Sequence, residues 1–225
     1  MPKVNSASDI RWTADFVNRH RSPNKEEEGF STPIRILALI ESAQAVVNLR
    51  DICQASPSLD GLIFAAEDFA HDLSITRTPS LTEFLYARSA IVTAARAYKL
   101  SSSIDLVCTS LPSKTGASKG ASQRMDEECI DGRGLGFNGK QCIHPSQVEI
   151  AHRCFAPNER ELEWSTRVIV ANEKAEKIGK GAWALDGSMI DMPVVRKAKA
   201  IIDRANACGQ DVNSVRLQWQ NQQPD

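Results

Sequence analysis

The feature that most constrains the fold is a repeat of short apolar runs separated by helical patterns. Four runs rich in branched residues cover Ile36–Ile40, Gly61–Ala66, Ile104–Thr109 and Lys140–Ile143, and Pro2–Val4 is a shorter candidate. These runs lack polar alternation, which is typical of parallel strands covered on both faces. Their starts lie roughly 25 to 40 residues apart, the length of a βα unit. The pattern predicts an α/β fold.

Residues with helical apolar spacing lie between and after these runs. The expected helices cover Ala43–Ala55, Leu81–Leu100, Pro145–Phe155, Glu159–Lys177 and Met192–Ala207. Four or five βα units are too few for a closed eight-stranded barrel, which typically needs about 250 residues. Periodicity therefore leaves open both a small open sheet and part of a barrel.

Two polar stretches interrupt the pattern. Arg21–Thr32 is a polar insert, and Leu111–Arg124 is rich in Ser, Gly and Lys and is expected to be a mobile loop.

Composition excludes several classes of protein. Lys+Arg number 27 and Asp+Glu 28 in 225 residues, so no basic excess suits a general nucleic-acid binder. The apolar fraction of 42% is that of a folded protein, and no run of about 18 apolar residues predicts a membrane span. The first 16 residues lack the apolar core of a signal peptide and carry Asp9 and Asp15, which a transit peptide avoids.

The six cysteines indicate reduced, mostly buried thiols. They contain no C-x-x-C pair, which argues against a structural zinc site. They stand at positions 53, 108, 129, 142, 154 and 208.

Acidic residues directly follow two of the predicted strands. Glu41 follows the first run, and Glu67 and Asp68 follow the second. The carboxyl ends of parallel strands carry the active sites of α/β folds, and Mg²⁺ is typically held by one or two carboxylates. Alternatively, each acid caps the helix that follows it and interacts with the positive end of the helix dipole. The pattern alone leaves both interpretations open.

The glycine-rich segment Gly134–Gln141 is not predicted to bind nucleotide. It fits G-x-x-x-x-G-K and G-x-G-x-x-G, but both phosphate motifs need a strand before and a helix after. Here the expected order is inverted, and Gln141 stands where a P-loop needs Ser or Thr. The segment is better explained as a helix C-cap and a turn into a strand.

Two other positions have both a functional and a structural interpretation. His144 follows the last strand, where barrels often bind phosphate, but Pro145 and Ser146 also indicate a helix start with Ser146 near the cap. Asp191, followed by Pro193, is a good helix-start signature.

Five ordered segments resemble the HpcH/HpaI aldolase and citrate lyase beta-subunit family, in its citrate lyase beta-like, citramalyl-CoA lyase branch. The resemblance runs from about Met1 to Gly209. It implies part of a TIM (β/α)8 barrel of the pyruvate/phosphoenolpyruvate superfamily, about strands four to eight with C-terminal helices. The segments are "LALIESAQAVVNL", "GLIFAAEDFAHDL", "LYARSAIVTAARAY", "GFNGKQCIHPSQV" and "GAWALDGSMIDMPVV".

The resemblance also implies a division of the chain. Residues 1–178 would form the partial barrel, 179–209 a C-terminal lid segment and helix, and 210–225 a polar tail. The family pattern places about three βα units, with an Arg that holds the substrate carboxylate, before "MPKV", and these are absent from this sequence.

Specific roles follow from the resemblance. Glu41 and Asp68 match the family's Mg²⁺ ligands, with Glu41 also beside the substrate, and Asp191 matches an acid/base residue that reaches a neighbouring subunit's site. The implied function is an Mg²⁺-dependent carbon–carbon lyase acting on a 3-hydroxyacyl-CoA of the citramalyl-CoA or malyl-CoA type. The products would be a 2-oxo acid and acetyl-CoA.

Three alternatives to this function stay open: a malyl-CoA thioesterase at the same site, a catalytically inactive shortened member, and a regulatory or assembly subunit. The implied partners are an acyl-CoA substrate and further copies in a homotrimer or larger homo-oligomer, without nucleic acid or membrane. The implied compartment is mitochondrial or cytoplasmic.

Overall fold

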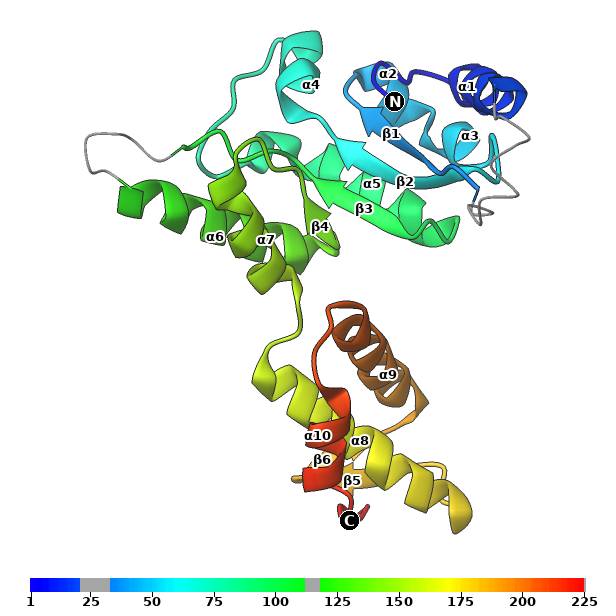
Figure 1. The fold of residues 1–225 in the computed structure, drawn as a ribbon, viewed down its shortest axis with the longest axis vertical. Helices are drawn as coiled ribbons and strands as arrows, with labels where there is room; N and C mark the ends of the chain where they lie inside the picture. The colour runs from blue at the N-terminus through cyan, green and yellow to red at the C-terminus, as the bar shows by residue number, and fades with distance from the viewer. Residues whose placement is uncertain (21–32, 112–117, 225) are drawn as a thin grey trace. The chain divides into compact units, whose positions relative to one another are not determined.

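The computed structural model describes residues 1–20, 33–111 and 118–224. The chain divides into two compact units, which are described separately (Figure 1). We call Met1–Phe155 the sheet unit and Ala156–Asp225 the helical unit. The predicted insert Arg21–Thr32 and residues 112–117 of the predicted loop lie outside the described residues.

A parallel sheet of four strands forms the centre of the sheet unit (Figure 1). The strands are paired in chain order, which is the arrangement of successive βα units in a barrel. This confirms the predicted α/β fold with a parallel sheet. The strands are β1 (Ile36–Ile40), β2 (Leu59–Phe64), β3 (Ser102–Asp105) and β4 (Gly139–Lys140).

The strand bounds differ from the predicted ones where apolar runs and strands do not coincide. β3 ends at Asp105, but Leu106 and Cys108 continue the apolar run because both are buried in the core. β4 begins one residue earlier than predicted. Pro2–Val4 is not a strand, although Met1 O accepts a hydrogen bond from Leu39 N at 2.9 Å.

Helices connect the strands of the sheet unit. The predicted helix Ala43–Ala55 is two short helices that meet at Asn48, and α1 and α4 were not among the predicted helices. The first residues of α6, Ser118–Arg124, were expected to belong to a loop, and this prediction is wrong. The helices are α1 (Ala7–His20), α2 (Ala43–Val47), α3 (Leu49–Cys53), α4 (Ala66–Leu73), η2 (Thr82–Phe84), α5 (Leu85–Ala97), α6 (Ser118–Leu135), η3 (Pro145–Gln147) and α7 (Val148–Phe155).

The two faces of the sheet differ in burial. α5 packs against β2 and β3, and α6 and α7 pack against β4, so alternate strand residues are fully buried. Phe64, Phe69 and Phe84 add an edge-to-face aromatic cluster at the end of β2. The other face carries apolar side chains that are only half-buried, namely Leu37, Leu39, Ile63 and Ile104.

A buried ion network joins the helices to the sheet. Arg88 of α5 is 2% exposed and donates two hydrogen bonds to the fully buried Asp105, at 3.0 and 2.8 Å, and a third to Asp131 at 2.7 Å. Burial lowers the pKa of Arg88, but its bonds to Asp105 and Asp131 outweigh this and raise it. Lys140 Nζ lies 3.1 Å from Glu128 and 3.8 Å from Asp105. A network of this kind depends on every partner being present.

The helical unit combines three helices with a hairpin. α8 (Glu159–Lys177) begins with a capping box of Asn158 and Glu161 and packs against α9 (Met192–Ala207) and α10 (Val212–Gln218). Strands β5 (Trp183–Leu185) and β6 (Ser188–Ile190) flank the two-residue turn Asp186-Gly187. Both turn residues have positive φ, 51° and 74°, as a type I′ turn requires.

The compact units divide the chain differently from the expected domains. Residues 156–178 were expected to belong to the barrel. They lie in the helical unit, where α8 packs against α9 and α10. The expected polar tail, 210–225, contains α10. Among the described residues, no helix combines the length and apolar character that a membrane crossing needs.

The cysteines differ in burial, and this difference predicts the order in which their thiols react with an alkylating reagent. Burial raises the pKa of Cys53 to about 11 and that of Cys129 to about 12, whereas Cys208 is exposed. Only the thiolate reacts, and a pKa of 11 leaves about one thiolate per thousand at pH 8. We expect iodoacetamide to label Cys208 first, and Cys53 and Cys129 only after unfolding. Peptide mass spectrometry checks this, and early labelling of Cys129 would contradict the burial.

Candidate metal centre

Glu41 is the first residue after β1 and is almost completely buried. Alternation along β1 places Leu37 and Leu39 on the half-buried face of the sheet, and Glu41 continues that alternation. Its side chain is 4% exposed. The cap of α2 is Ser42, whose Oγ accepts from Ala45 N at 3.0 Å. The capping alternative is therefore wrong for Glu41, and its carboxylate faces other partners.

Asp68 lies in the first turn of α4, directly after β2. The N-cap of α4 is Ala65, and neither Glu67 nor Asp68 makes a side-chain capping bond. The two acids have different partners: Glu67 accepts a hydrogen bond from Arg77 at 2.6 Å, whereas Asp68 faces Lys3. Both carboxylates lie near the positive end of the α4 dipole, which stabilises negative charge. Only Asp68 faces Lys3, which also contacts Glu41.

Lys3 brings the two predicted metal ligands together. Its Nζ lies 3.4 Å from Asp68 Oδ2 and 3.7 Å from Glu41 Oε1. Its backbone N–H also donates to Glu41 Oε1 at 2.5 Å. Lys3 Nζ therefore lies within ion-pair range of both carboxylates at once.

The donor set fits Mg²⁺. Two carboxylates supply hard oxygen ligands, and Mg²⁺ usually keeps several waters or substrate oxygens. In the described part of the chain, no group of three or more His, Cys, Asp or Glu side chains is arranged to hold a metal ion. Two protein carboxylates would leave the other positions of an Mg²⁺ octahedron to water or substrate oxygens.

Two residues that pair with the acids after β1 and β2, Lys3 and Arg77, were not singled out in the sequence. Arg77 links Glu67 to Glu128 at 3.0 Å and to the carbonyl of Val107 at 3.0 Å. No local pattern marks Arg77. Lys3 had a recognisable signal, because it lies in the candidate strand Pro2–Val4, and the next predicted strand along the chain, Ile36–Ile40, is followed by Glu41.

The segments after α6 serve structural roles. α6 ends at Leu135, Gly136 adopts φ +100°, and β4 follows, so Gly134–Gln141 is a helix end and a turn, as predicted. His144 is itself the cap of η3, with Nδ1 accepting from Ser146 N at 3.1 Å. The helix-start interpretation is therefore confirmed, with His144 rather than Ser146 as the cap.

Asp191 lies in the helical unit and caps α9. Its Oδ1 accepts a hydrogen bond from Val194 N at 3.1 Å, and Pro193 stands in the first turn. The predicted helix start is confirmed.

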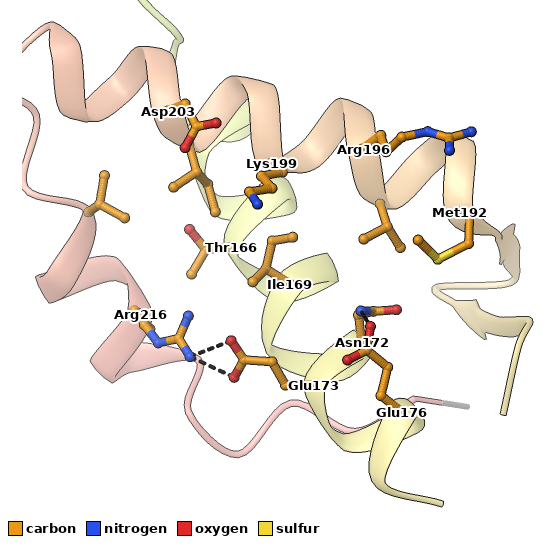
Figure 2. Close-up of a pocket in the computed structure, with 13 residues that line it drawn as sticks. Thr166, Ile169, Asn172, Glu173, Glu176, Met192, Arg196, Lys199, Asp203 and Arg216 are labelled. Carbon is orange, nitrogen blue, oxygen red and sulfur yellow. Dashed lines mark hydrogen bonds and ion pairs between the residues drawn. The ribbon is translucent and has the colours of Figure 1, made fainter. Parts of the chain in front are cut away.

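A cavity of about 510 Å³ lies between α8, α9 and α10 (Figure 2). Met192, the neighbour of Asp191, lines one end, and Ile169 lies on the α8 side. Arg216 closes another side by pairing with Glu173 at 2.6 Å (Figure 2). None of the predicted site residues lines this cavity.

Comparison with known proteins decides the family. Residues 1–145 match the model of the HpcH/HpaI aldolase/citrate lyase family. The chain belongs to this family. Among relatives of this HpcH/HpaI member, human mitochondrial citramalyl-CoA lyase is 31% identical over 92% of the chain. The citrate lyase subunit beta of Leuconostoc mesenteroides is 34% identical, also over 92%. The chain spans about three fifths of the human protein's length (59%) and 65% of the Leuconostoc protein.

Solved structures of the family share the fold. A citrate lyase from Burkholderia xenovorans superposes with a TM-score of 0.75, over 97% of the chain and 66% of that protein, at 23% identity. Protein CitE of Mycobacterium tuberculosis, in complex with magnesium, acetoacetate and coenzyme A, gives a TM-score of 0.65 at 26% identity, over 92% of the chain and 67% of that protein. These matches confirm the predicted fold class, a partial barrel of the citrate lyase beta type.

Proposed function

We propose that this family member is an Mg²⁺-dependent lyase that breaks a carbon–carbon bond in a 3-hydroxyacyl-CoA. The observation that carries the proposal is the meeting of Glu41 and Asp68 at one cation position, Lys3 Nζ. The named activity of the human relative and the magnesium and coenzyme A in the Mycobacterium structure support it. The substrate would be of the citramalyl-CoA or malyl-CoA type, giving a 2-oxo acid and acetyl-CoA.

The residues have separate tasks in this reaction. Glu41 and Asp68 would hold Mg²⁺, which would supply Lewis-acid stabilisation of the negative charge that develops on the substrate. Burial of Glu41 and its hydrogen bond from Lys3 N fix one ligand in place. When the bond breaks, the hydroxyl loses its proton and becomes the carbonyl of the 2-oxo acid, and the electron pair of the bond passes to the acetyl carbon, which gains a proton. Asp191 would move the proton at the acetyl carbon or at a bridging water.

The proposal extends to assembly and compartment. Asp191 belongs to the helical unit, and we propose that it acts in the site of a neighbouring copy, so the active form is a homotrimer or larger homo-oligomer. The human relative is mitochondrial, which supports a mitochondrial location, with the cytoplasm as the alternative.

The products distinguish the lyase from its alternatives. The purified 225-residue chain is sized by light scattering, and its main peak is incubated with citramalyl-CoA or malyl-CoA, with and without Mg²⁺. A lyase forms acetyl-CoA and a 2-oxo acid, a malyl-CoA thioesterase forms free CoA and malate, and an inactive member forms neither. We expect acetyl-CoA only with Mg²⁺, and free CoA as the sole product would favour the thioesterase.

Asp191 is expected to be necessary for turnover beyond its role as a cap. Asp191→Asn keeps a side-chain oxygen for Val194 N, so its unfolding free energy should change by less than about 1 kcal/mol. Loss of the carboxylate should lower kcat by at least about a hundredfold, the usual contribution of a positioned acid/base. Steady-state kinetics and urea unfolding check both. Full activity in Asp191→Asn would reduce Asp191 to a cap.

A further inference from the structure

Lys3 is held in an unusual backbone conformation beside the metal centre. Its φ is +56°, in the left-handed region that few non-glycine residues occupy. Such conformations persist only where the surroundings enforce them, and they gather at functional sites.

Hydrogen bonds fasten the chain on both sides of Lys3. Before it, Met1 O accepts from Leu39 N at 2.9 Å. After it, Asn5 O accepts from Asn48 Nδ2 at 2.8 Å, and Asn5 Oδ1 accepts from Ser42 Oγ. The backbone at Lys3 is therefore fixed relative to β1 and α2, and its N–H is aimed at Glu41.

The side chain of Lys3 is largely exposed to water although its backbone is fixed. Its side chain is 71% exposed, whereas that of Glu41 is 4% exposed. The ammonium lies at the place from which one cation contacts both carboxylates, but it can leave that place by rotating its side chain into water. A divalent ion that binds Glu41 and Asp68 must displace it or bind against its charge.

We propose that Lys3 is a tethered cation that competes with Mg²⁺ for Glu41 and Asp68 and so sets the magnesium concentration at which the site fills. This inference rests on the proposed magnesium site. In the metal-free protein the ammonium compensates the buried carboxylate of Glu41, which would otherwise be costly. The backbone N–H bond to Glu41 does not depend on the side chain, so the metal ligand keeps its orientation when the ammonium leaves.

The test is calorimetric titration of Mg²⁺ into the metal-stripped 225-residue chain, without substrate. Lys3→Met removes the charge and keeps the aliphatic stem, and Lys3→Arg keeps a cation. Lys99→Met is the matched control, because Lys99 is also exposed and has a nearly identical φ of +57°. We expect Lys3→Met to lower the Kd for Mg²⁺ about fivefold, which is the lower end of the affinity changes that coupled sites usually show. The Kd values of Lys3→Arg and Lys99→Met should stay near that of the wild type.

Each outcome has a distinct meaning. Tighter binding in Lys3→Met alone, or binding in Lys3→Met when wild type shows none, supports the competition. An unchanged or higher Kd in Lys3→Met overturns it and leaves the magnesium site standing. Absence of binding in wild type and in Lys3→Met overturns both this inference and the metal centre of the proposed function. Circular dichroism confirms folding, and Lys3→Gln serves as a second neutral variant.

Discussion

Glu41→Ala and Asp68→Ala should each abolish the stabilisation of the protein by Mg²⁺ and its metal-dependent turnover. A ligand that binds only the folded state raises the free energy of unfolding by RT ln(1 + c/Kd), where c is the free ligand concentration, so a loss of affinity on removal of one of two protein ligands removes the shift in melting temperature. Turnover should fall by about a thousandfold, because Lewis-acid stabilisation is worth several kcal/mol of the barrier. Thermal melts with and without Mg²⁺, together with kcat for acetyl-CoA formation, measure both effects.

Glu67→Ala is the matched control for Asp68→Ala. Both side chains are 56% exposed and lie in the same helical turn, but Glu67 pairs with Arg77 rather than Lys3. We expect Glu67→Ala to keep the Mg²⁺-induced shift. A shift that survives in Glu41→Ala and in Asp68→Ala would place the metal elsewhere, and equal losses in all three variants would indicate a nonspecific effect of the lost negative charge.

Among substitutions of charged residues in the sheet unit, Arg88→Met should lower the free energy of unfolding the most. It leaves the carboxylate of Asp105, which is fully buried, without its two-pronged partner. Removing one member of a buried ion pair costs about 3–5 kcal/mol because the other charge stays buried. Urea unfolding at neutral pH, followed by circular dichroism, measures the free energy lost.

The comparison for Arg88→Met is Arg153→Met. Arg153 pairs with Asp126 at 2.5 Å, but its side chain is 62% exposed, and exposed ion pairs contribute little. We expect a much smaller change for Arg153→Met. We also expect Asp105→Asn to recover part of the loss when it is combined with Arg88→Met, because the two effects are coupled. Equal free energies of unfolding for Arg88→Met and Arg153→Met would contradict a buried network.

The order of strands was predictable because each buried strand needs a run of branched apolar residues. The ends of the strands were less predictable, because Leu106 and Cys108 are buried without belonging to β3. α1 was not predicted because it buries only Ile10 and Ala14, so its apolar face is too short to show a helical pattern. The β5–β6 hairpin has a recognisable local signal, because Asp186-Gly187 stands between apolar residues and favours a two-residue hairpin turn.

The two acids of the proposed metal centre could be predicted from the sequence, and the contact of Lys3 with both could not. Glu41 directly follows β1, and Asp68 lies in the first turn of the helix after β2, so the parallel topology brings both residues to the same edge of the sheet. The choice of Asp68 over Glu67 came from family resemblance, and the opposite pairings with Lys3 and Arg77 favour the same choice. Lys3 lies 38 residues from Glu41 in sequence, and only the folded chain shows that it contacts both acids.

The most direct test of the account is to locate the metal. Mn²⁺ replaces Mg²⁺ in carboxylate sites and scatters anomalously, so a crystal of the 225-residue chain grown with Mn²⁺ reveals the ion itself. We expect one strong anomalous peak about 2.1 to 2.2 Å from a carboxylate oxygen of both Glu41 and Asp68, with Lys3 Nζ moved away from it. A peak that contacts neither acid, or no peak with Lys3 still between them, would contradict the proposed metal centre.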